Sequence, residues 1–289
     1  QSNNLMIKKW SKLLQNLDHP KQEVNIGVIA KYFQSGNFSL KDSYASVIEA
    51  VNHSAWARGC KPILHWIVSD NLENDKNLQE SLKKYNGLIV PQGWGSRGVE
   101  GKIKAVEIAR TNKIPYLGLC FGMQMAVIEY ARNVAKLKGA NSTEVDPKTS
   151  FPVIHMMEDQ KQNILDKNYG GTIRLGAYPC KLNKDSLLYS LYDKNKSDLF
   201  QKMPVVDERH RHRYEFNNSY KESLEKLGLI ISGTSPNGDL VEAIELDKKI
   251  HPFFVGTQYH PELKSHFTSP HPIFLGFIDA CLDNKKANS

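Results

Sequence analysis

Short apolar runs alternate with longer amphipathic stretches through the first half of the chain. Residues 24–32 are rich in β-branched side chains and predict a buried strand, whereas residues 40–59 repeat their apolar positions with helical spacing. The same alternation then continues, with strands predicted at 63–68, 87–90 and 116–119 and helices predicted at 71–85, 99–112 and 123–134. This order predicts an α/β fold, built on a doubly wound, mostly parallel sheet with flanking helices.

The second half of the chain has a less regular pattern. Its apolar runs predict strands at 151–157, 229–233, 240–246 and 253–259, and helices at 219–227 and 272–282. Polar composition predicts a surface loop over 158–168 and a solvated insertion over 193–202, and the glycine-rich segment 170–176 leads into a further strand. The pattern contains no internal repeat and no linker, so we expect one domain over residues 24–285.

The first residues stand apart from this domain. Residues 1–23 form a polar lead-in with helical character. Because the chain opens on Gln1 rather than on Met, we expect these residues to include an expression remnant or a linker within a longer chain.

Composition narrows the class of protein. The chain is 40% hydrophobic and 24% charged, which is ordinary for a globular protein, and it has neither a bilayer-length apolar run nor a signal-peptide pattern. We therefore expect a cytoplasmic protein with no membrane partner. The four cysteines, Cys60, Cys120, Cys180 and Cys281, are too widely spaced for a disulfide framework or a paired metal site. No metal is expected.

Charge alone suggests a weaker alternative. The net charge of +7 would suit a nucleic-acid partner, yet 31 acidic residues are interspersed among 38 basic ones. The sequence also lacks a basic stripe studded with aromatic residues. We therefore expect no nucleic-acid binding, and a nucleic-acid binder would show strongly salt-dependent retention on DNA or RNA.

An apolar run stops abruptly at Cys120, in the segment Gly118-Leu-Cys-Phe-Gly-Met-Gln124. A strand, a sharp turn with small residues on both sides, and a helix form an elbow that lifts a side chain above a parallel sheet. The helix N-terminus also favours a thiolate. A buried structural cysteine is the plainer interpretation, but the two glycines and the helix start favour a nucleophile.

His260 and Glu262 repeat this placement at the end of another apolar run. A histidine near the thiol can accept and return a proton, and a carboxylate can orient the imidazole and stabilise its charged form. The reaction also needs oxyanion donors. The N–H of Phe121 and that of Gly93, in the segment Pro91-Gln-Gly-Trp-Gly95, are candidates, although either glycine loop alone could be a plain turn.

These residues together resemble the class I (triad) glutamine amidotransferase family. Gly118-Leu-Cys-Phe-Gly-Met-Gln124 and Tyr259-His-Pro-Glu262 carry the resemblance to the class as a whole. Segments 42–47, 97–101, 140–144, 170–176 and 208–215 are similar, more narrowly, to the glutaminase domains of the CTP synthase family. The resemblance implies a flavodoxin-like fold and extends over residues 24–282.

The resemblance implies hydrolysis of L-glutamine to glutamate and ammonia. Cys120 would attack the side-chain amide to form a thioester, and His260 would protonate the departing ammonia. Three further positions, Gln124, Glu144 and Arg213, match residues that hold the substrate in the family. The charges of Glu144 and Arg213 are consistent with this role, because a carboxylate suits the α-ammonium of glutamine and a cation suits its α-carboxylate. Taken alone, Glu144 would be a solvated loop acid and 208–213 an exposed basic face.

Activation by GTP is also implied, with Arg97 and Arg174 at the matching positions, although a surface arginine is more often only solvated. No phosphate-binding loop is present, so the amidoligase domain that aminates UTP to CTP, with its ATP, UTP and Mg²⁺, is expected outside this chain. That domain would use the ammonia and would mediate homo-oligomerisation. No cofactor is expected in the glutaminase domain itself.

One departure from the family affects the proposed oxyanion loop. The family usually has Pro-Gly-Gly-Phe-Gly, whereas this chain has Gln92 and Trp94 in that segment. Gln92 adds a side chain at a flexible position, so the loop conformation is open. The alternatives to a CTP synthase glutaminase domain are a free-standing γ-glutamyl hydrolase, a glutaminase subunit of another synthetase, or a catalytically silent module for assembly or nucleotide sensing.

Overall fold

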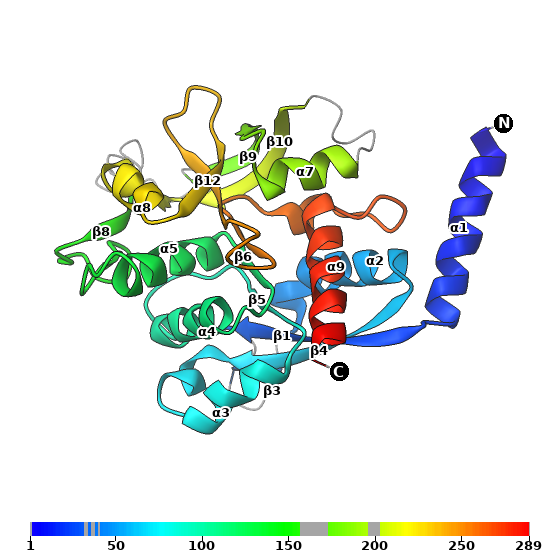
Figure 1. Cartoon of the computed structure of the whole chain (residues 1–289), viewed down its shortest axis with the longest axis horizontal. Coiled ribbons are helices and arrows are strands. Elements are labelled where there is room, and N and C mark those ends of the chain that lie inside the picture. Colours follow the sequence, from blue (N-terminus) through cyan, green and yellow to red (C-terminus); the bar gives the residue numbers. More distant parts are fainter. Residues whose placement is uncertain are drawn as a thin grey trace.

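A nine-stranded sheet forms the centre of the computed structural model, which describes residues 2–31, 34–35, 38–39, 41–156, 173–195 and 203–288 (Figure 1). The strand order is β10-β9-β12-β13-β14-β6-β5-β1-β4. Five neighbouring strands are parallel, namely β4 (Cys60–Val68), β1 (Gln22–Ala30), β5 (Gly87–Val90), β6 (Tyr116–Leu119) and β14 (Phe254–Thr257). The sheet continues through antiparallel pairs to β13 (Val241–Leu246), β12 (Leu229–Thr234), β9 (Arg174–Leu182) and β10 (Val205–His212).

Helices cover both faces of this sheet. One face packs against α2 (Ala45–Ala57), α7 (Leu187–Lys194) and α9 (Pro272–Ala287). The other face packs against α4 (Val99–Thr111), α5 (Phe121–Asn133) and α8 (Lys221–Lys226). The parallel strands β5, β6 and β14 are buried on both faces, which explains their continuous apolar runs. The predicted α/β class with a doubly wound sheet is confirmed.

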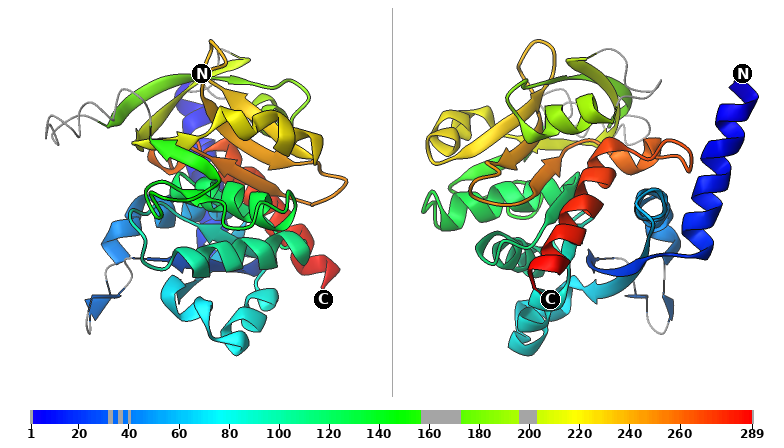
Figure 2. Two further views of the ribbon diagram at one scale, coloured as in Figure 1. Left: turned by 90° about the vertical axis from the view of Figure 1, so that its left-hand side faces the viewer. Right: turned by 45° about the vertical axis from the view of Figure 1, so that its right-hand side comes forward.

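The remaining elements are short or lie at the edge of the molecule. Helix α1 (Ser2–Asp18) stands beyond α2, and its Asn16 Nδ2 donates to Trp56 O at 2.8 Å (Figure 2). The others are β2 (Gln34–Ser35), β3 (Phe38–Ser39), α3 (Lys76–Ser81) and a small sheet of β7 (Asn141–Ser142), β8 (Pro152–Met156) and β11 (Tyr214–Phe216). Short 3₁₀ helices cover Lys41–Tyr44, Ser69–Glu73, Leu82–Lys84, Asn218–Tyr220 and Pro261–Lys264.

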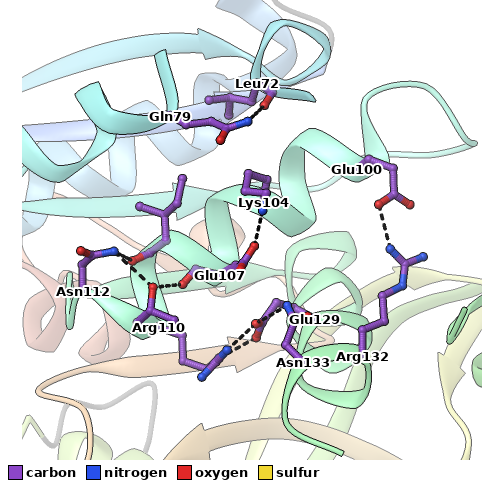
Figure 3. Close-up of polar contacts among 12 residues, drawn as sticks. Leu72, Gln79, Glu100, Lys104, Glu107, Arg110, Asn112, Glu129, Arg132 and Asn133 are labelled. Atoms are coloured by element: carbon purple, nitrogen blue, oxygen red, sulfur yellow. Dashed lines mark hydrogen bonds and ion pairs between the residues drawn. The ribbon is translucent and has the colours of Figure 1, made fainter. Parts of the chain in front are cut away.

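Ion pairs fasten α4 to α5, the helix that begins beside Cys120 (Figure 3). Arg110 donates two hydrogen bonds, of 2.7 and 2.8 Å, to the fully buried Glu129 carboxylate. Arg132 makes a second link to Glu100 at 2.7 Å. A bidentate arginine–carboxylate pair fixes orientation as well as distance. These ion pairs therefore fix α5, the helix that begins beside Cys120, against α4.

Two sequence expectations need correction. The helix expected over 71–85 is broken into two 3₁₀ turns and the short α3, which begins where the Asp75 side chain caps Leu78 N–H. The segment 205–212 forms β10, and the alternative interpretation of 208–213 as an exposed basic face holds only for the side of the strand that carries Arg209 and Arg211. Glu208, His210 and His212 point inward, because side chains alternate along a strand.

Several other expectations lie partly or wholly outside the described residues: the loop over 158–168, the glycines of 170–176 and most of the insertion over 193–202. In the part of the chain that is described, none of the helices is both long and apolar enough to cross a bilayer.

Candidate active site

Cys120 occupies the corner between β6 and α5 with a positive φ of 51°. Positive φ is costly for a residue with a side chain and is a recurring feature of functional sites. The corner is held by Cys120 N–H, which donates to Thr257 O at 2.6 Å. A Cβ on Gly122 would lie 1.9 Å from Val90 O, so only glycine lets α5 approach β5 this closely. The predicted elbow is therefore present.

His260 and Glu262 lie directly after β14, the parallel neighbour of β6. The register pairs Thr257 with Leu119, so both strands end at the same edge of the sheet. His260 Nδ1 lies 2.7 Å from Glu262 Oε1, and both side chains are buried. A carboxylate only accepts, so Nδ1 carries a proton and Nε2 is left for Cys120.

The electrostatics of His260 favour its charged form. Burial alone would lower the pKa of His260, but the Glu262 carboxylate and Cys120 outweigh it and raise this pKa above the ordinary value. The structure therefore favours the imidazolium form of His260. Nε2 of His260 is buried and remains available to Cys120, which helps to raise the pKa of His260.

Gly93 lies beside Phe121, as an oxyanion hole requires. A Cβ on Gly93 would lie 3.3 Å from the Phe121 ring. Phe121 is the first residue of α5, and N–H groups in the first turn of a helix have no partner within that helix. The two residues predicted to donate therefore lie against one another, and Phe121 directly follows Cys120.

Two buried lysines, which the sequence interpretation missed, hold the loop that contains Gly93. Lys102 Nζ donates to Pro91 O at 2.9 Å, and Lys31 Nζ donates to Trp94 O and, at 2.6 Å, to Gly95 O. Both ammonium groups face the Phe121 ring, 5.1 Å from its centroid for Lys31 and 5.4 Å for Lys102. The loop is therefore anchored through its carbonyl groups, whatever the side chain at position 92.

Burial shifts the titration of both lysines. It lowers the pKa of Lys31 to about 8 and, together with the neighbouring Lys31 charge, lowers the pKa of Lys102 to about 7. Lys102 could have been found in the sequence, because it lies on the same helix face as the apolar positions 99, 103 and 106.

Gln92 is accommodated without disturbing the loop. Its Nε2 donates to Ser43 O at 3.3 Å, which leads the side chain toward the turn before α2. Trp94 is 37% exposed. The departure from the usual family sequence therefore leaves Gly93 in contact with Phe121.

The predicted substrate residues contact the oxyanion loop and the residues next to it. Glu144 Oε1 accepts from Gly95 N–H at 2.7 Å, and Arg213 is close enough for its charge to affect the pKa of Glu144, which burial raises. Gln124 Nε2 donates to Tyr214 O at 3.0 Å and leaves its buried Oε1 without a hydrogen bond from any described residue. Glu144 thus offers an anionic group, Arg213 a cationic group and Gln124 a hydrogen-bond acceptor.

Gln258 is a further site residue that the sequence interpretation missed. Its Nε2 lies 3.6 Å from Cys120 Sγ, and its Oε1 accepts from Gln124 at 3.3 Å. The available signal is a polar residue inside the apolar run that ends at His260. Gln258 joins the sulfur to the substrate side of the site.

The two predicted effector arginines lie in different settings. Arg97 donates to Lys31 O and approaches Asp70 Oδ2 at 3.5 Å, with 59% of its side chain exposed, so it borders the oxyanion loop. Arg174 is buried and paired with Glu242 Oε1 at 2.7 Å. The structure therefore does not bring the two guanidinium groups to one surface, and their effector role stays a prediction.

The other cysteines differ from Cys120. Burial raises the pKa of Cys60 to about 11 and raises the pKa of Cys180 and Cys281 well above its ordinary value. All four are free thiols. Within the described ranges, no group of three or more His, Cys, Asp or Glu side chains is arranged to hold a metal ion.

Comparison with known proteins agrees with this geometry. The family described as "Glutamine amidotransferase class-I" matches residues 39–280. The chain belongs to the class I glutamine amidotransferases. Among solved structures, the Trypanosoma brucei CTPS glutaminase domain with bound acivicin matches this amidotransferase with a TM-score of 0.77 and 36% identity, over 90% of this chain and 94% of that one.

Curated relatives of this amidotransferase are longer than the chain. CTP synthase from Caldanaerobacter subterraneus subsp. tengcongensis is 48% identical over 283 residues, which is 98% of this chain and 49% of the relative. CTP synthase from Cytophaga hutchinsonii is 49% identical over 97% of this chain and 48% of its own length. The amidotransferase thus spans about half the length of the curated relatives it matches.

Proposed function

We propose that this chain is the glutaminase domain of a CTP synthase and hydrolyses L-glutamine to glutamate and ammonia. The observation that carries the proposal is the convergence of Cys120, His260 and Glu262 at one sheet edge, beside Gly93 and Phe121. The identity to CTP synthases over nearly the whole chain supports the same conclusion.

The first half of the reaction forms a thioester. The Cys120 thiolate attacks the side-chain carbonyl carbon of glutamine, and the developing oxyanion is stabilised by the N–H groups of Gly93 and Phe121. The carbon–nitrogen bond then breaks as His260 Nε2 gives its proton to the departing amine. Ammonia leaves, and the γ-glutamyl group stays on sulfur.

The second half regenerates the enzyme. The neutral His260 takes a proton from a water molecule, and the resulting hydroxide attacks the thioester carbon. The carbon–sulfur bond breaks, glutamate leaves, and the thiolate again faces an imidazolium. Glu262 keeps the imidazole in the required tautomer throughout.

The substrate is held by charge and by hydrogen bonds. Glu144 is assigned to the α-ammonium of glutamine and Arg213 to its α-carboxylate, as their opposite charges require. Gln124 offers its unpaired Oε1 to a substrate N–H.

The remainder of the proposal concerns the longer protein. Since the chain spans about half of its relatives, an amidoligase domain outside it would take up the ammonia, use ATP, UTP and Mg²⁺ to make CTP, and mediate homo-oligomerisation. GTP would activate the glutaminase through Arg97 and Arg174. The free thiols suit the reducing cytoplasm.

The experiment measures ammonia release from glutamine by the purified chain, alone and joined to a CTP synthase amidoligase half. Glutamine-dependent CTP formation by the joined protein, lost in Cys120→Ala, is the expected result. Hydrolysis without CTP would instead indicate a free-standing hydrolase or a subunit of another synthetase. Absence of both activities, together with no labelling of Cys120 by an electrophilic glutamine analogue with or without GTP, would indicate a catalytically silent module.

A further inference from the structure

Two amide side chains link the Tyr214 carbonyl to the sulfur of Cys120. Gln124 Nε2 lies 3.0 Å from Tyr214 O and 3.3 Å from Gln258 Oε1. Gln258 Nε2 in turn lies 3.6 Å from Cys120 Sγ. Gln124 is 2% exposed and Gln258 is fully buried. Burying an amide is costly unless it is hydrogen-bonded, and the proposed reaction gives Gln258 no role.

The Tyr214 carbonyl determines which way both amides face. The nitrogen and oxygen of an amide exchange places when the group is turned over, so its hydrogen bonds decide the orientation. A carbonyl oxygen only accepts, so Gln124 presents its nitrogen to Tyr214 O. The second N–H of that nitrogen needs an acceptor in Gln258, which is Oε1. The nitrogen of Gln258, a donor, is therefore the atom that faces the sulfur.

The backbone around Gln258 holds this donor in place. Gln258 N–H donates to Glu242 O on β13 at 2.8 Å. The preceding carbonyl, Thr257 O, accepts from Cys120 N–H at 2.6 Å. The residue is thus fixed to β13 on one side and to the elbow of Cys120 on the other. A thiolate gains more from a nearby donor than a thiol does, because hydrogen bonds to a charged group are the stronger ones.

We infer that Gln258 serves the reaction directly: its side chain donates a hydrogen bond to the Cys120 thiolate and couples the sulfur to Gln124. Each amide in this row accepts through its oxygen and donates through its nitrogen, so the hydrogen bonds run in one direction. Hydrogen bonds in such a row polarise one another. A substrate N–H bound at Gln124 Oε1 therefore strengthens the donor at the sulfur. This last step rests on the proposed glutaminase function, whereas the contact between Gln258 and Cys120 does not.

The first test measures the sulfur in the absence of glutamine. Gln258→Met keeps the side-chain length and removes the donor, and Gln258→Glu keeps the shape and places a carboxylate against the sulfur. The rate at which iodoacetamide alkylates Cys120 is measured against pH by mass spectrometry, and a thermal melt shows that each variant is folded. We expect the rise of the rate to move to higher pH in Gln258→Met and further still in Gln258→Glu.

Other charged groups near the sulfur are the same in these proteins. They are His260 with its partner Glu262 after β14, and Lys102 on α4. None of them is substituted, so a displaced profile reports the change at position 258. Gln79→Met is the matched control, because the Gln79 amide is also hydrogen-bonded, at 2.6 Å, but to Leu72 O in the turn before α3 (Figure 3).

An alkylation profile that stays in the wild-type position in both variants would show that Gln258 only fills space, and would overturn its role at the sulfur. A profile that moves to lower pH in Gln258→Met would do the same. Neither outcome depends on glutamine hydrolysis. If the wild-type chain hydrolyses no glutamine, the proposed function fails, while the profiles still test the contact between Gln258 and Cys120.

The second test concerns the coupling to the substrate side. Gln124→Met removes the donor to Gln258 Oε1, so we expect it to move the alkylation profile in the same direction as Gln258→Met but by less. An unmoved profile in Gln124→Met would overturn the coupling.

The third test measures turnover. In Gln258→Met we expect kcat/KM for glutamine to fall about tenfold, on the scale of one hydrogen bond to a charged group, and in Gln79→Met to stay within about twofold of wild type. Equal kcat/KM in the two variants would overturn the role of Gln258 in the reaction.

Discussion

The parallel and antiparallel halves of the sheet contribute to the site in different ways. In the parallel half, strand ends place the reacting groups through backbone geometry: Cys120 at a strained corner, Gly93 in an anchored loop and His260 after the last parallel strand. In the antiparallel half, buried side chains such as Arg174 and Glu242 pair with one another. The reacting groups are thus placed by the backbone in the parallel half. In the antiparallel half, buried side chains are oriented by their contacts with one another.

Removing the nucleophile should give the largest effect. Cys120→Ala should lower kcat for glutamine hydrolysis by about 10⁴-fold or more, because the thioester cannot form. Cys281→Ala is the matched control, because this thiol packs against Gly87 and burial raises its pKa well above the ordinary value. Steady-state ammonia release measures both. Residual activity above one hundredth of wild type would mean that the parallel half does not supply the nucleophile.

Glu262→Gln should move the pH profile as well as the rate. The Glu262 carboxylate helps raise the pKa of His260, so its loss should lower that pKa, and the imidazolium should disappear at a lower pH. We expect the alkaline limb of kcat/KM to shift toward neutral pH and kcat to fall roughly 100-fold or more, because the tautomer is no longer fixed. An alkaline limb in the same place as in wild type contradicts the assigned orientation.

Lys102→Met should separate stability from activity. Because the pKa of Lys102 is lowered to about 7 in the folded chain, the unfolded chain binds the proton more tightly. Wild-type stability should therefore rise as pH increases from about 7 toward the unfolded pKa of Lys, about 10.4. Melting temperature measured against pH should lose this rise in Lys102→Met.

The activity of Lys102→Met should fall about tenfold. The Pro91 carbonyl loses the hydrogen bond from Lys102 Nζ, and the oxyanion loop loses the positive charge of that lysine. Lys104→Met is the control, because Lys104 lies on the same helix and pairs with Glu107 at the surface rather than with the loop. Equal activity in the two variants would show that the buried lysine does not support the loop.

Gln92→Gly should have the smallest effect. The loop is held by Lys102, Lys31 and Glu144 through its backbone, and Gln92 adds only a bond of 3.3 Å to Ser43 O. We expect kcat/KM within about twofold of wild type, as for most surface changes away from buried contacts. A loss above tenfold would show that the side chain at position 92 sets the oxyanion geometry.

Local sequence patterns predicted the parallel half of the molecule well. The strand over 116–119 and the elbow at Cys120 follow from a continuous apolar run that ends between glycines. The convergence of Cys120 and His260 follows from the rule that parallel strands share one carboxyl edge. Such positions depend on backbone geometry, which short patterns encode.

The antiparallel half was harder to predict, because its inward-facing positions are charged. Glu208, His210 and His212 alternate with arginines on β10, so the strand period is present but the apolar signal is not. Their burial depends on partners such as Glu242, which lies on another strand. Pairing between distant charges cannot be read from a local pattern.

The difference among the four cysteines makes it possible to measure the fraction of functional molecules in a sample. All four sulfurs are buried, and burial raises the pKa of Cys60, Cys180 and Cys281, whereas Cys120 lies beside His260, whose own pKa is raised. A small alkylating reagent at neutral pH should therefore modify one sulfur per folded molecule. The fraction of competent protein in any preparation, or in any variant above, can be determined from the mass spectrum before a rate is compared.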